Sequence, residues 1–432
     1  MKLRKKLAVT VTLFIIVGAG LGTAVAFGYL NIHQPKIQKT AYGDIYLAFT
    51  GEVYDKIKNN YWDKVPDDQL AILYKLAIDK VTTKTSTSDP KTKDDIIQLI
   101  KTTIADYDKD KKKEFVASVN DIVLANLKPF GRSRLYTQKE TQALSDTVVN
   151  KDTATDLYAA IGADKNATPK DIATAYQKTE NELRNDKTPE GQQKLAEAKR
   201  AYDALSNPDN KAVYDQTKIE PTVIYKLLTS DIFYIHLTKF SPQSFDELQK
   251  AINSIDPAKK NGPTSMILDL RGNIGGAIDI LQYFLGPFIG PDRYAYEFFH
   301  QGDTTPFKTK VGWLAGLVRY KKVVVLINEK DQSSTEVMAA TLKKYNVGVL
   351  VGTTTKGWGT VESVIPLEQQ IDPNEKFSVL MVHDLTLRDD GQPIEGKGVD
   401  PTINIKDKDW QKQLMSYFNY PGLVEEVRKL VQ

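Results

Sequence analysis

Apolar residues in the first third of the chain recur at the three-and-four spacing of amphipathic helices. From Tyr46 to about Val81 this spacing predicts two helices, and Pro66-Asp67-Asp68 marks the break between them. A similar pattern, with lysine-rich exposed faces, continues to about Ser145. We therefore expect a helical arm within residues 33–150.

From Asp231 onward, apolar runs short enough for buried strands alternate with helical patterns. The predicted strands are Ile232–Leu237, Ser265–Leu270, Val323–Ile327 and Val347–Val351, with helices around 245–255, after Ala277 and over 335–345. Such alternation is typical of an α/β core that binds ligands at the carboxyl ends of its strands. The sequence predicts this core over residues 221–432.

Between these two regions, residues 151–220 carry a third pattern, typical of a small helical domain. Thr168-Pro169 combines an N-cap residue with proline at the first helical position, and Asn207-Pro208 ends one helix and begins another. The fold class expected for the whole chain is a multidomain combination of α+β and α/β parts. Its parts are a transmembrane helix, a helical arm, a small helical domain and an α/β core.

The first thirty residues predict a membrane segment. A basic cluster precedes an uncharged run from Leu7 to Leu30, which as a helix would span ~36 Å against a hydrocarbon core of ~30 Å. The positive flank places the N-terminus in the cytoplasm and the bulk of the chain outside it. Residues 1–32 are thus expected to form a single-pass anchor in the cell membrane. Ala24-Val25-Ala26 also fits a signal peptidase site, so a cleaved signal peptide is the alternative, and both predict export.

Composition excludes several functional classes. The 432 residues are 41% hydrophobic and 26% charged, as in a folded globular protein, and the net charge is only +3. No strongly basic footprint for nucleic acid is present. The absence of cysteine excludes a catalytic thiol or a thiolate metal site. The four histidines are scattered without ligand spacing, so the sequence predicts no metal site and no cofactor.

Three stretches of the predicted core carry chemistry. Ile267–Gly276 reads as a buried strand and a glycine-rich turn, and glycines in such a turn let backbone N–H groups approach an anion. Ser333 follows the predicted strand Val323–Ile327 and begins a helix, although Ser333-Ser-Thr-Glu336 is equally a capping box. The third stretch is Val351–Glu362, followed by Gly396-Lys-Gly-Val-Asp-Pro401.

Taken in this order, the three stretches resemble the C-terminal processing (tail-specific) peptidases, a serine peptidase family with a serine-lysine dyad. Leu268-Asp-Leu-Arg-Gly-Asn-Ile-Gly-Gly276 matches the most distinctive string of the family, and the similarity extends from about Asp231 to Ile405. Residues 49–81 are also similar to its N-terminal helical arm. The resemblance implies that protein or peptide substrates are the partners of this chain.

The resemblance implies a nucleophile at Ser333 but puts Trp358 where the family has its base lysine. The glutamine that orients this lysine is replaced by Glu362. Lys356 lies two residues before Trp358, so in extended backbone it would point to the same face and could serve as an unusual base. A solvated lysine is the alternative. The oxyanion would be held by N–H groups of Ser334 and of the Gly275-Gly276 turn.

The small helical domain resembles the J domain of the DnaJ co-chaperone family. Asp156-Leu-Tyr-Ala-Ala-Ile-Gly at its start and Ala201-Tyr-Asp-Ala-Leu-Ser-Asn-Pro208 near its end carry the similarity. The His-Pro-Asp loop of the family reads Arg184-Asn185-Asp186 here, and an exported domain would be separated from a cytoplasmic chaperone ATPase. Both points argue against a chaperone ATPase as partner. The PDZ domain usual in the peptidase family is not found between residues 82 and 225.

Three functional hypotheses follow. The first is a membrane-anchored, extracytoplasmic serine endopeptidase acting on exported or unfolded proteins, with Ser333, Lys356 and Glu362 as catalytic residues. The second is a catalytically inactive pseudopeptidase that serves as a scaffold or protein-binding module. The third, a co-chaperone, requires the missing His-Pro dipeptide.

Overall fold

The computed structural model describes residues 42–152, 155–255, 262–388 and 390–431. The predicted membrane segment within residues 1–32 lies outside these ranges. Inside them, no helix combines the length and the apolar character needed to cross a membrane.

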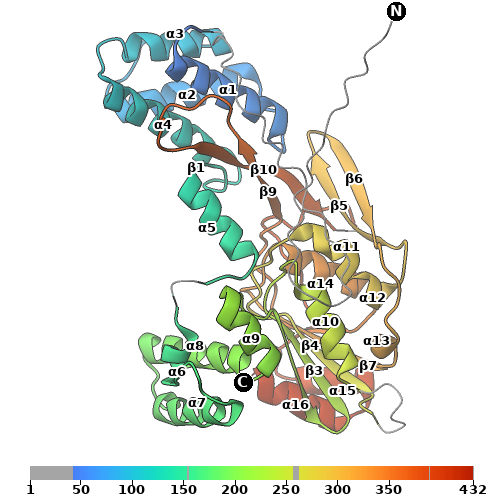
Figure 1. Cartoon of the computed structure of the whole chain (residues 1–432). Coiled ribbons are helices and arrows are strands. Elements are labelled where there is room, and N and C mark those ends of the chain that lie inside the picture. Colours follow the sequence, from blue (N-terminus) through green and yellow to red (C-terminus); the bar gives the residue numbers. More distant parts are fainter. Residues whose placement is uncertain (1–41, 153–154, 256–261, 389, 432) are drawn as a thin grey trace, which may run out of the picture. The chain divides into compact units, whose positions relative to one another are not determined.

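The arm contains four helices (Figure 1). They are α1 (Ile45–Asn60), α2 (Asp67–Thr82), α3 (Lys93–Thr103) and α4 (Lys109–Ala125). Helix α3 begins with a capping box between Thr92 and Asp95, which satisfies N–H groups that the first turn leaves without partners. The hydroxyl of Tyr74 on α2 donates a hydrogen bond of 2.9 Å to the buried side chain of Asn120 on α4. The two helices predicted between Tyr46 and Val81 are confirmed.

An antiparallel sheet lies beside the arm. Its strands are β1 (Arg134–Thr137), β5 (Tyr294–His300), β6 (Asp303–Lys308), β9 (Thr360–Pro366) and β10 (Phe377–Leu387). The order is β1-β10-β5-β6, and β9 also pairs with β10, so the long strand β10 organises the sheet. Phe49 of α1 meets Phe377 edge-on at 5.9 Å, and Val379 and Met381 complete the buried core of the arm. The sequence did not predict this sheet.

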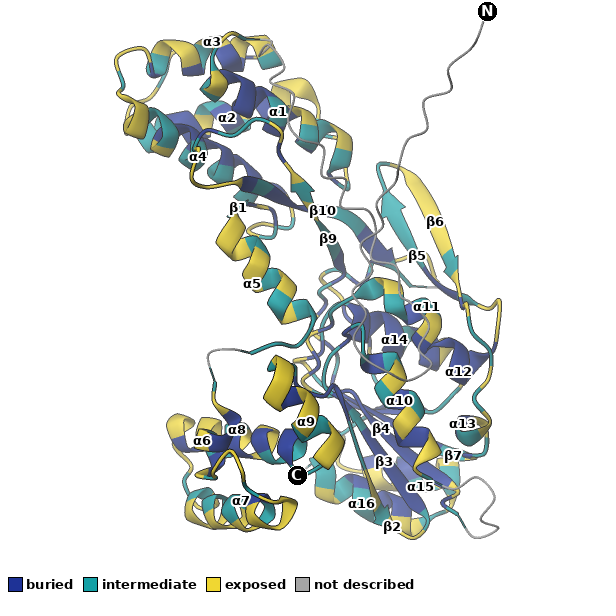
Figure 2. Cartoon of the chain, viewed as in Figure 1, coloured by how far each residue is buried: buried dark blue, intermediate teal, exposed yellow. Residues whose placement is uncertain are grey.

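The predicted α/β core contains a second sheet of six strands in the order β11-β8-β7-β4-β3-β2. Strands β3 (Ile232–Leu237), β4 (Ser265–Asp269), β7 (Lys322–Ile327), β8 (Val349–Gly352) and β11 (Ile403–Asn404) are parallel, and β2 (Val223–Thr229) is antiparallel. The four predicted strands correspond to β3, β4, β7 and β8. All residues of β4 are buried, as a strand covered on both faces requires (Figure 2).

Helices cover both faces of this parallel sheet. One face packs in a common core with α10 (Ser244–Asn253), α11 (Leu281–Phe284), α12 (Gly286–Ile289), α13 (Ala315–Val318) and α14 (Ser334–Lys344). The other face packs with α15 (Trp410–Phe418) and α16 (Pro421–Val431). The helix predicted after Ala277 begins as a 3₁₀ turn, Ile278–Ile280, and continues as the short helices α11 and α12, which are separated only by Leu285.

The small helical domain has its own core. Helices α6 (Leu157–Ile161), α7 (Pro169–Leu183), α8 (Pro189–Leu205) and α9 (Pro208–Thr217) bury a cluster around Tyr158 and Tyr214. The caps predicted at Thr168-Pro169 and Asn207-Pro208 are confirmed. In the loop that replaces His-Pro-Asp, the Asp186 carboxylate accepts hydrogen bonds from the N–H and the hydroxyl of Thr188 at the start of α8.

A two-stranded stem carries this domain. The N–H of Glu220 donates to the backbone oxygen of Asn150 at 3.0 Å, and Lys151 forms an antiparallel bridge with Ile219. The chain therefore enters and leaves the domain at adjacent backbone positions.

Helix α5 (Gln138–Val148) precedes the stem and none of its residues is buried. A capping box between Thr137 and Glu140 begins it. Side chains that follow β3 hold its end, since Lys239 donates to the carbonyl of Thr147 at 2.9 Å and Ser241 to that of Val148 at 2.7 Å. These bonds satisfy carbonyl groups that a helix end leaves without partners and fix α5 to the α/β core.

Candidate active site

The glycine-rich turn after β4 is held by buried hydrogen bonds. The Asn273 side chain donates to the carbonyl of Leu237 at 2.9 Å and accepts the N–H of Gly275 at 2.8 Å. The N–H of Gly272 donates to Asp331 at 2.7 Å, which ties the turn to the loop after β7. At the end of β4, burial opposes ionisation of Asp269, but two hydrogen bonds from Arg271 hold the pKa of this carboxyl below its usual range.

Gly275 and Gly276 have to be glycines because of their backbone angles and their neighbours. Their φ angles are 90° and 137°, in the region that L side chains rarely adopt. A Cβ on Gly275 would lie 2.7 Å from the Cβ of Ser333, and one on Gly276 would lie 2.0 Å from the backbone oxygen of Phe240. The missing side chains thus bring this turn into direct contact with Ser333.

Ser333 lies in a strained turn between strand β7 and helix α14. Its φ is 55° and its ψ is −124°, a conformation that costs a residue other than glycine roughly 1–3 kcal/mol. Such strain in a strand-to-helix turn exposes the hydroxyl of nucleophilic serines. Ser333 and Glu336 also form the predicted capping box, so the capping role and a nucleophilic role coexist in one turn.

Two backbone N–H groups beside Ser333 are available to an anion. Among the described residues, no acceptor lies within hydrogen-bonding reach of the N–H groups of Gly276 and Ser334. The hydroxyl of Ser334 donates to the carbonyl of Gly276 at 3.0 Å, which fixes the two positions relative to each other. The N–H of Gly275 is already used by Asn273. The arrangement therefore offers Gly276 and Ser334, rather than Gly275, as oxyanion donors.

Glu336 organises the site, a role that the capping-box pattern alone did not predict. Its buried carboxylate accepts the N–H of Ser333 at 3.0 Å and the N–H groups of Gly357 and Trp358, both at 2.7 Å. It also accepts the hydroxyl of Thr355 at 2.5 Å. Burial raises the pKa of Glu336, and these four donors act in the opposite direction. One side chain thus joins helix α14 to the loop between β8 and β9.

Trp358 occupies the position that the resemblance assigns to the base lysine. Its backbone oxygen accepts the N–H of Ser333 at 3.0 Å, so this position is next to the serine. The indole N–H donates to Glu362 at 3.3 Å, and the Arg132 guanidinium lies 3.9 Å from the centre of the ring. Arg132 is itself paired with Glu395 at 2.6 Å. The charged groups on either side therefore hold the indole ring of Trp358 in this position.

Lys356 lies in the same loop but in an exposed position. The loop is not the extended strand on which the prediction for Lys356 was based, because Gly357 has a φ of 80° and strand β9 begins only at Thr360. The Lys356 ammonium lies 5.6 Å from the centre of the Trp358 ring. The backbone N–H of Lys356 donates to the carbonyl of Asp331. Among the described contacts of Lys356, none joins its ammonium to Ser333.

A pocket of about 1080 Å³ opens at Ser333. Helix α5 lines one side through Leu144 and Val148, and β5, β6, β9 and β10 contribute a mixed apolar and polar wall. Of the predicted site residues, Gly275, Gly276, Ser333 and Glu362 line this pocket, together with Trp358, whereas Ser334 and Lys356 do not. The pocket is large enough for several residues of an extended peptide.

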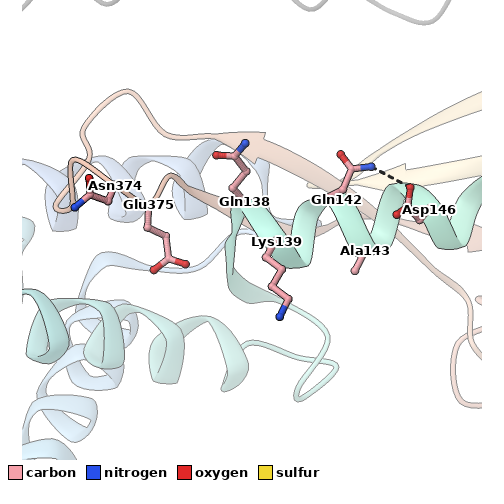
Figure 3. Close-up of a pocket in the computed structure, with 7 residues that line it drawn as sticks. All are labelled: Gln138, Lys139, Gln142, Ala143, Asp146, Asn374 and Glu375. Atoms are coloured by element: carbon pink, nitrogen blue, oxygen red, sulfur yellow. Dashed lines mark hydrogen bonds between the residues drawn. The ribbon is translucent and has the colours of Figure 1, made fainter. Parts of the chain in front are cut away.

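A smaller pocket of about 580 Å³ lies on another face of α5 (Figure 3). Gln142 and Asp146, joined by a hydrogen bond of 3.0 Å, line it together with Asn374 and Glu375. None of its lining residues is a nucleophile or part of a catalytic pair, so the candidate chemistry belongs to the pocket at Ser333.

The stability of this region is expected to depend on pH through Asp331. Burial raises the pKa of its carboxyl to about 8, against the opposing effect of N–H groups from Asn328 and Gly272. An aspartate in the unfolded chain has a pKa near 3.9, so between about pH 4 and pH 8 the folded chain binds more protons than the unfolded chain. The free energy of unfolding should therefore decrease as pH rises through this window.

Thermal unfolding of the parent and of Asp331→Asn from pH 5 to pH 9 checks this expectation. The parent should lose stability toward pH 8, and the variant should show a flatter profile. Parallel profiles would mean that Asp331 is already ionised at pH 5.

Comparison with known proteins finds two family models that match segments of this chain. Residues 231–405 match the model of peptidase family S41, and residues 156–215 match the model of the DnaJ domain. Both resemblances noted in the sequence are confirmed over these segments.

Two curated relatives and one solved structure illustrate the similarity. The carboxy-terminal-processing protease of Bartonella bacilliformis is 30% identical over 203 residues, 46% of this chain and 44% of the relative. The carboxy-terminal processing protease CtpA of Bacillus subtilis is 29% identical over 209 residues, 48% and 42% of the two chains. This chain thus aligns with less than half the length of these relatives. The photosystem II D1 C-terminal processing protease covers 83% of this chain and 92% of its own, at 14% identity and a TM-score of 0.47.

Proposed function

We propose that this protein is a serine endopeptidase that cleaves exported or unfolded proteins in the pocket at Ser333. The observation that supports it best is the backbone of Ser333, strained at φ 55° and ψ −124° beside the N–H groups of Gly276 and Ser334, which have no acceptor within the described part of the chain. A strained serine next to two oxyanion donors suits acyl transfer and has no evident value in a scaffold.

In this mechanism, the Ser333 hydroxyl attacks the peptide carbonyl and the two N–H groups stabilise the oxyanion. The proton of the hydroxyl requires an acceptor. Lys356 is the proposed acceptor, and it would have to move from the face of the Trp358 ring toward Ser333. Glu362, hydrogen-bonded to the indole N–H, would orient the groups around it.

The proposed location is the outer side of a cell membrane. The uncharged run from Leu7 to Leu30 behind a basic cluster supports a single-pass anchor with the peptidase segment outside. A topology reporter fused after residue 432 in a bacterial host tests it, since a cytoplasmic signal from the reporter would contradict the proposal.

Cleavage of a fluorescently labelled unfolded protein by the full chain in detergent tests the activity. Ser333→Ala should lower the cleavage rate at least about a thousandfold, because it removes the nucleophile. Lys356→Met should lower it by about a hundredfold or more if Lys356 accepts the proton. Circular dichroism of each variant shows whether folding is intact. Cleavage that persists in Ser333→Ala would contradict the proposed nucleophile, and unchanged cleavage in Lys356→Met would contradict the proposed base.

A second function, peptide binding without cleavage, is favoured by Trp358. The indole fills the base position and is held by Arg132 and Glu362, while Lys356 is exposed. If the dyad is broken in this way, Trp358→Lys should create or increase cleavage that depends on Ser333. A parent that binds unfolded protein without cutting it, together with an active Trp358→Lys variant, would favour this binding function over the enzyme.

A further inference from the structure

Two of the four histidines of the chain come together where β5 and β10 pair. Phe299 of β5 is the cross-strand neighbour of Leu385 of β10, so His300 and Asp384 occupy the next pair of positions along the same ladder. His383 adjoins Asp384, and its ring stacks on that of His300 with ring centres 4.5 Å apart. The wide separation of His300 and His383 in the sequence hid this cluster from a search for ligand spacing.

An irregularity in β10 explains why neighbouring side chains gather here. The pairing of β10 with β9 shifts between Val382 and Asp384, so His383 is an extra residue without a partner on β9. A bulge of this kind re-aims the side chains next to it. His383 and Asp384 both line the pocket that contains Ser333.

Both imidazoles turn Nδ1 toward the carboxylate of Asp384, at 3.9 Å for His300 and 2.8 Å for His383. Nδ1 of His300 lies 2.6 Å from the backbone oxygen of His383, and Nδ1 of His383 lies 2.8 Å from Oδ2 of Asp384. Both oxygens accept, so without an ion each Nδ1 carries the hydrogen of these bonds; in the other neutral tautomer the hydrogen is on Nε2, and Nδ1 presents a lone pair toward Asp384. An ion held by both Nδ1 atoms and by a carboxylate oxygen of Asp384 would take the place of these hydrogens.

The cluster is compact enough for a single ion. His300, His383 and Asp384 each offer one ligand atom, and these atoms all lie within 4.8 Å of one another. Donors bonded to one zinc ion at about 2.1 Å are roughly 3.4 Å apart in a tetrahedron. Closing the difference requires shifts of about an ångström, which side-chain rotation supplies. The side chains keep 29%, 35% and 15% of their surface exposed, so an ion and its water have access.

We propose that His300, His383 and Asp384 bind a divalent transition-metal ion of the zinc type at the wall of the Ser333 pocket. Two imidazoles and one carboxylate favour zinc and its neighbours over calcium or magnesium, which prefer oxygen ligands. Three protein ligands leave a fourth position for water or for a carboxylate or carbonyl of a bound peptide. This proposal does not depend on whether Ser333 is catalytic.

Calorimetric titration of the tag-free full chain with ZnCl₂, after treatment with a chelator, tests the proposal. We expect one ion per chain in the parent. His300→Gln and His383→Gln should each raise the dissociation constant for zinc at least about tenfold. His33→Gln, which removes a histidine outside the described residues, is the matched control and should bind like the parent. Because the chain has no cysteine, no thiolate competes for the metal.

A second measurement separates lost binding from lost folding. Added Zn²⁺ should raise the melting temperature of the parent and of His33→Gln but not that of His300→Gln or His383→Gln, because a ligand that binds only the folded chain stabilises it. Melting temperatures in chelator show whether the variants fold. Absence of zinc binding by the folded parent would overturn the proposal, as would equal binding by the folded His300→Gln and His383→Gln variants.

Discussion

Replacing Glu336 with alanine is expected to destabilise the folded chain by about 3–5 kcal/mol and to abolish any activity of Ser333. The substitution leaves the N–H groups of Gly357 and Trp358 and the hydroxyl of Thr355 without their acceptor, whereas the N–H of Ser333 keeps the backbone oxygen of Trp358. A buried donor that loses its partner costs roughly 1–3 kcal/mol, and water entering the space left by the side chain offsets part of the sum. The loop between β8 and β9 would then lose its attachment to helix α14.

Chemical denaturation measures this loss, and Glu329→Ala serves as the matched control. Glu329 lies in the same loop as Ser333 but is exposed, and it accepts a hydrogen bond from Thr353 at 2.6 Å. Its replacement should cost less than about 1 kcal/mol. Equal losses in the two variants would show that Glu336 has no special role in holding the site together.

Gly276→Ala is the second substitution that is expected to lower the free energy of unfolding by a large amount. The new Cβ would lie 2.0 Å from the backbone oxygen of Phe240, and the φ of 137° is itself unfavourable for alanine. Because the obstacle is backbone, relief requires breaking the bond from the N–H of Ala277 to Phe240, now 2.9 Å long. We expect a loss of at least about 3 kcal/mol and displacement of the Gly276 N–H from its place beside Ser333.

Gly302→Ala separates the effect of the unfavourable backbone angle from the effect of the steric clash. Gly302 has a φ of 103°, but a Cβ there would meet nothing within 4 Å. This control should lose only about 1 kcal/mol, the cost of the backbone angle alone. Melting curves of both variants check the expectation. A loss in Gly276→Ala no greater than in Gly302→Ala would mean that the turn yields easily and does not fix the oxyanion donors.

The parts of the fold that could be predicted are those encoded locally. Apolar runs predicted β3, β4, β7 and β8, and proline and cap residues predicted the starts of α7 and α9, because neighbouring residues alone determine these features. The antiparallel sheet was missed. Its central strand β10 pairs Val379 with Leu135 of β1, and pairing over so long a separation leaves no periodic signal in either segment.

The residues of the candidate site also divide into those that local sequence predicted and those that depend on distant contacts. Ser333 and the Gly275-Gly276 turn were found because each stands at a recognisable strand end, and the structure brings them into contact. The role of Glu336 could not be predicted, since three of its four donors belong to Thr355, Gly357 and Trp358 in a distant loop. The prediction for Lys356 assumed extended backbone, and one glycine at φ 80° was enough to change its direction.

The stem of the small helical domain has a consequence for protein engineering. Asn150 and Glu220 lie opposite each other, and Lys151 bridges Ile219, so the domain is an insertion whose two ends lie next to each other. Such an inserted domain can be excised and the two ends of the remaining chain rejoined by a tight turn. It can also be exchanged for another small domain with neighbouring termini. The rest of the chain would then serve as a platform on which one small domain is exchanged for another while the pocket at Ser333 stays the same.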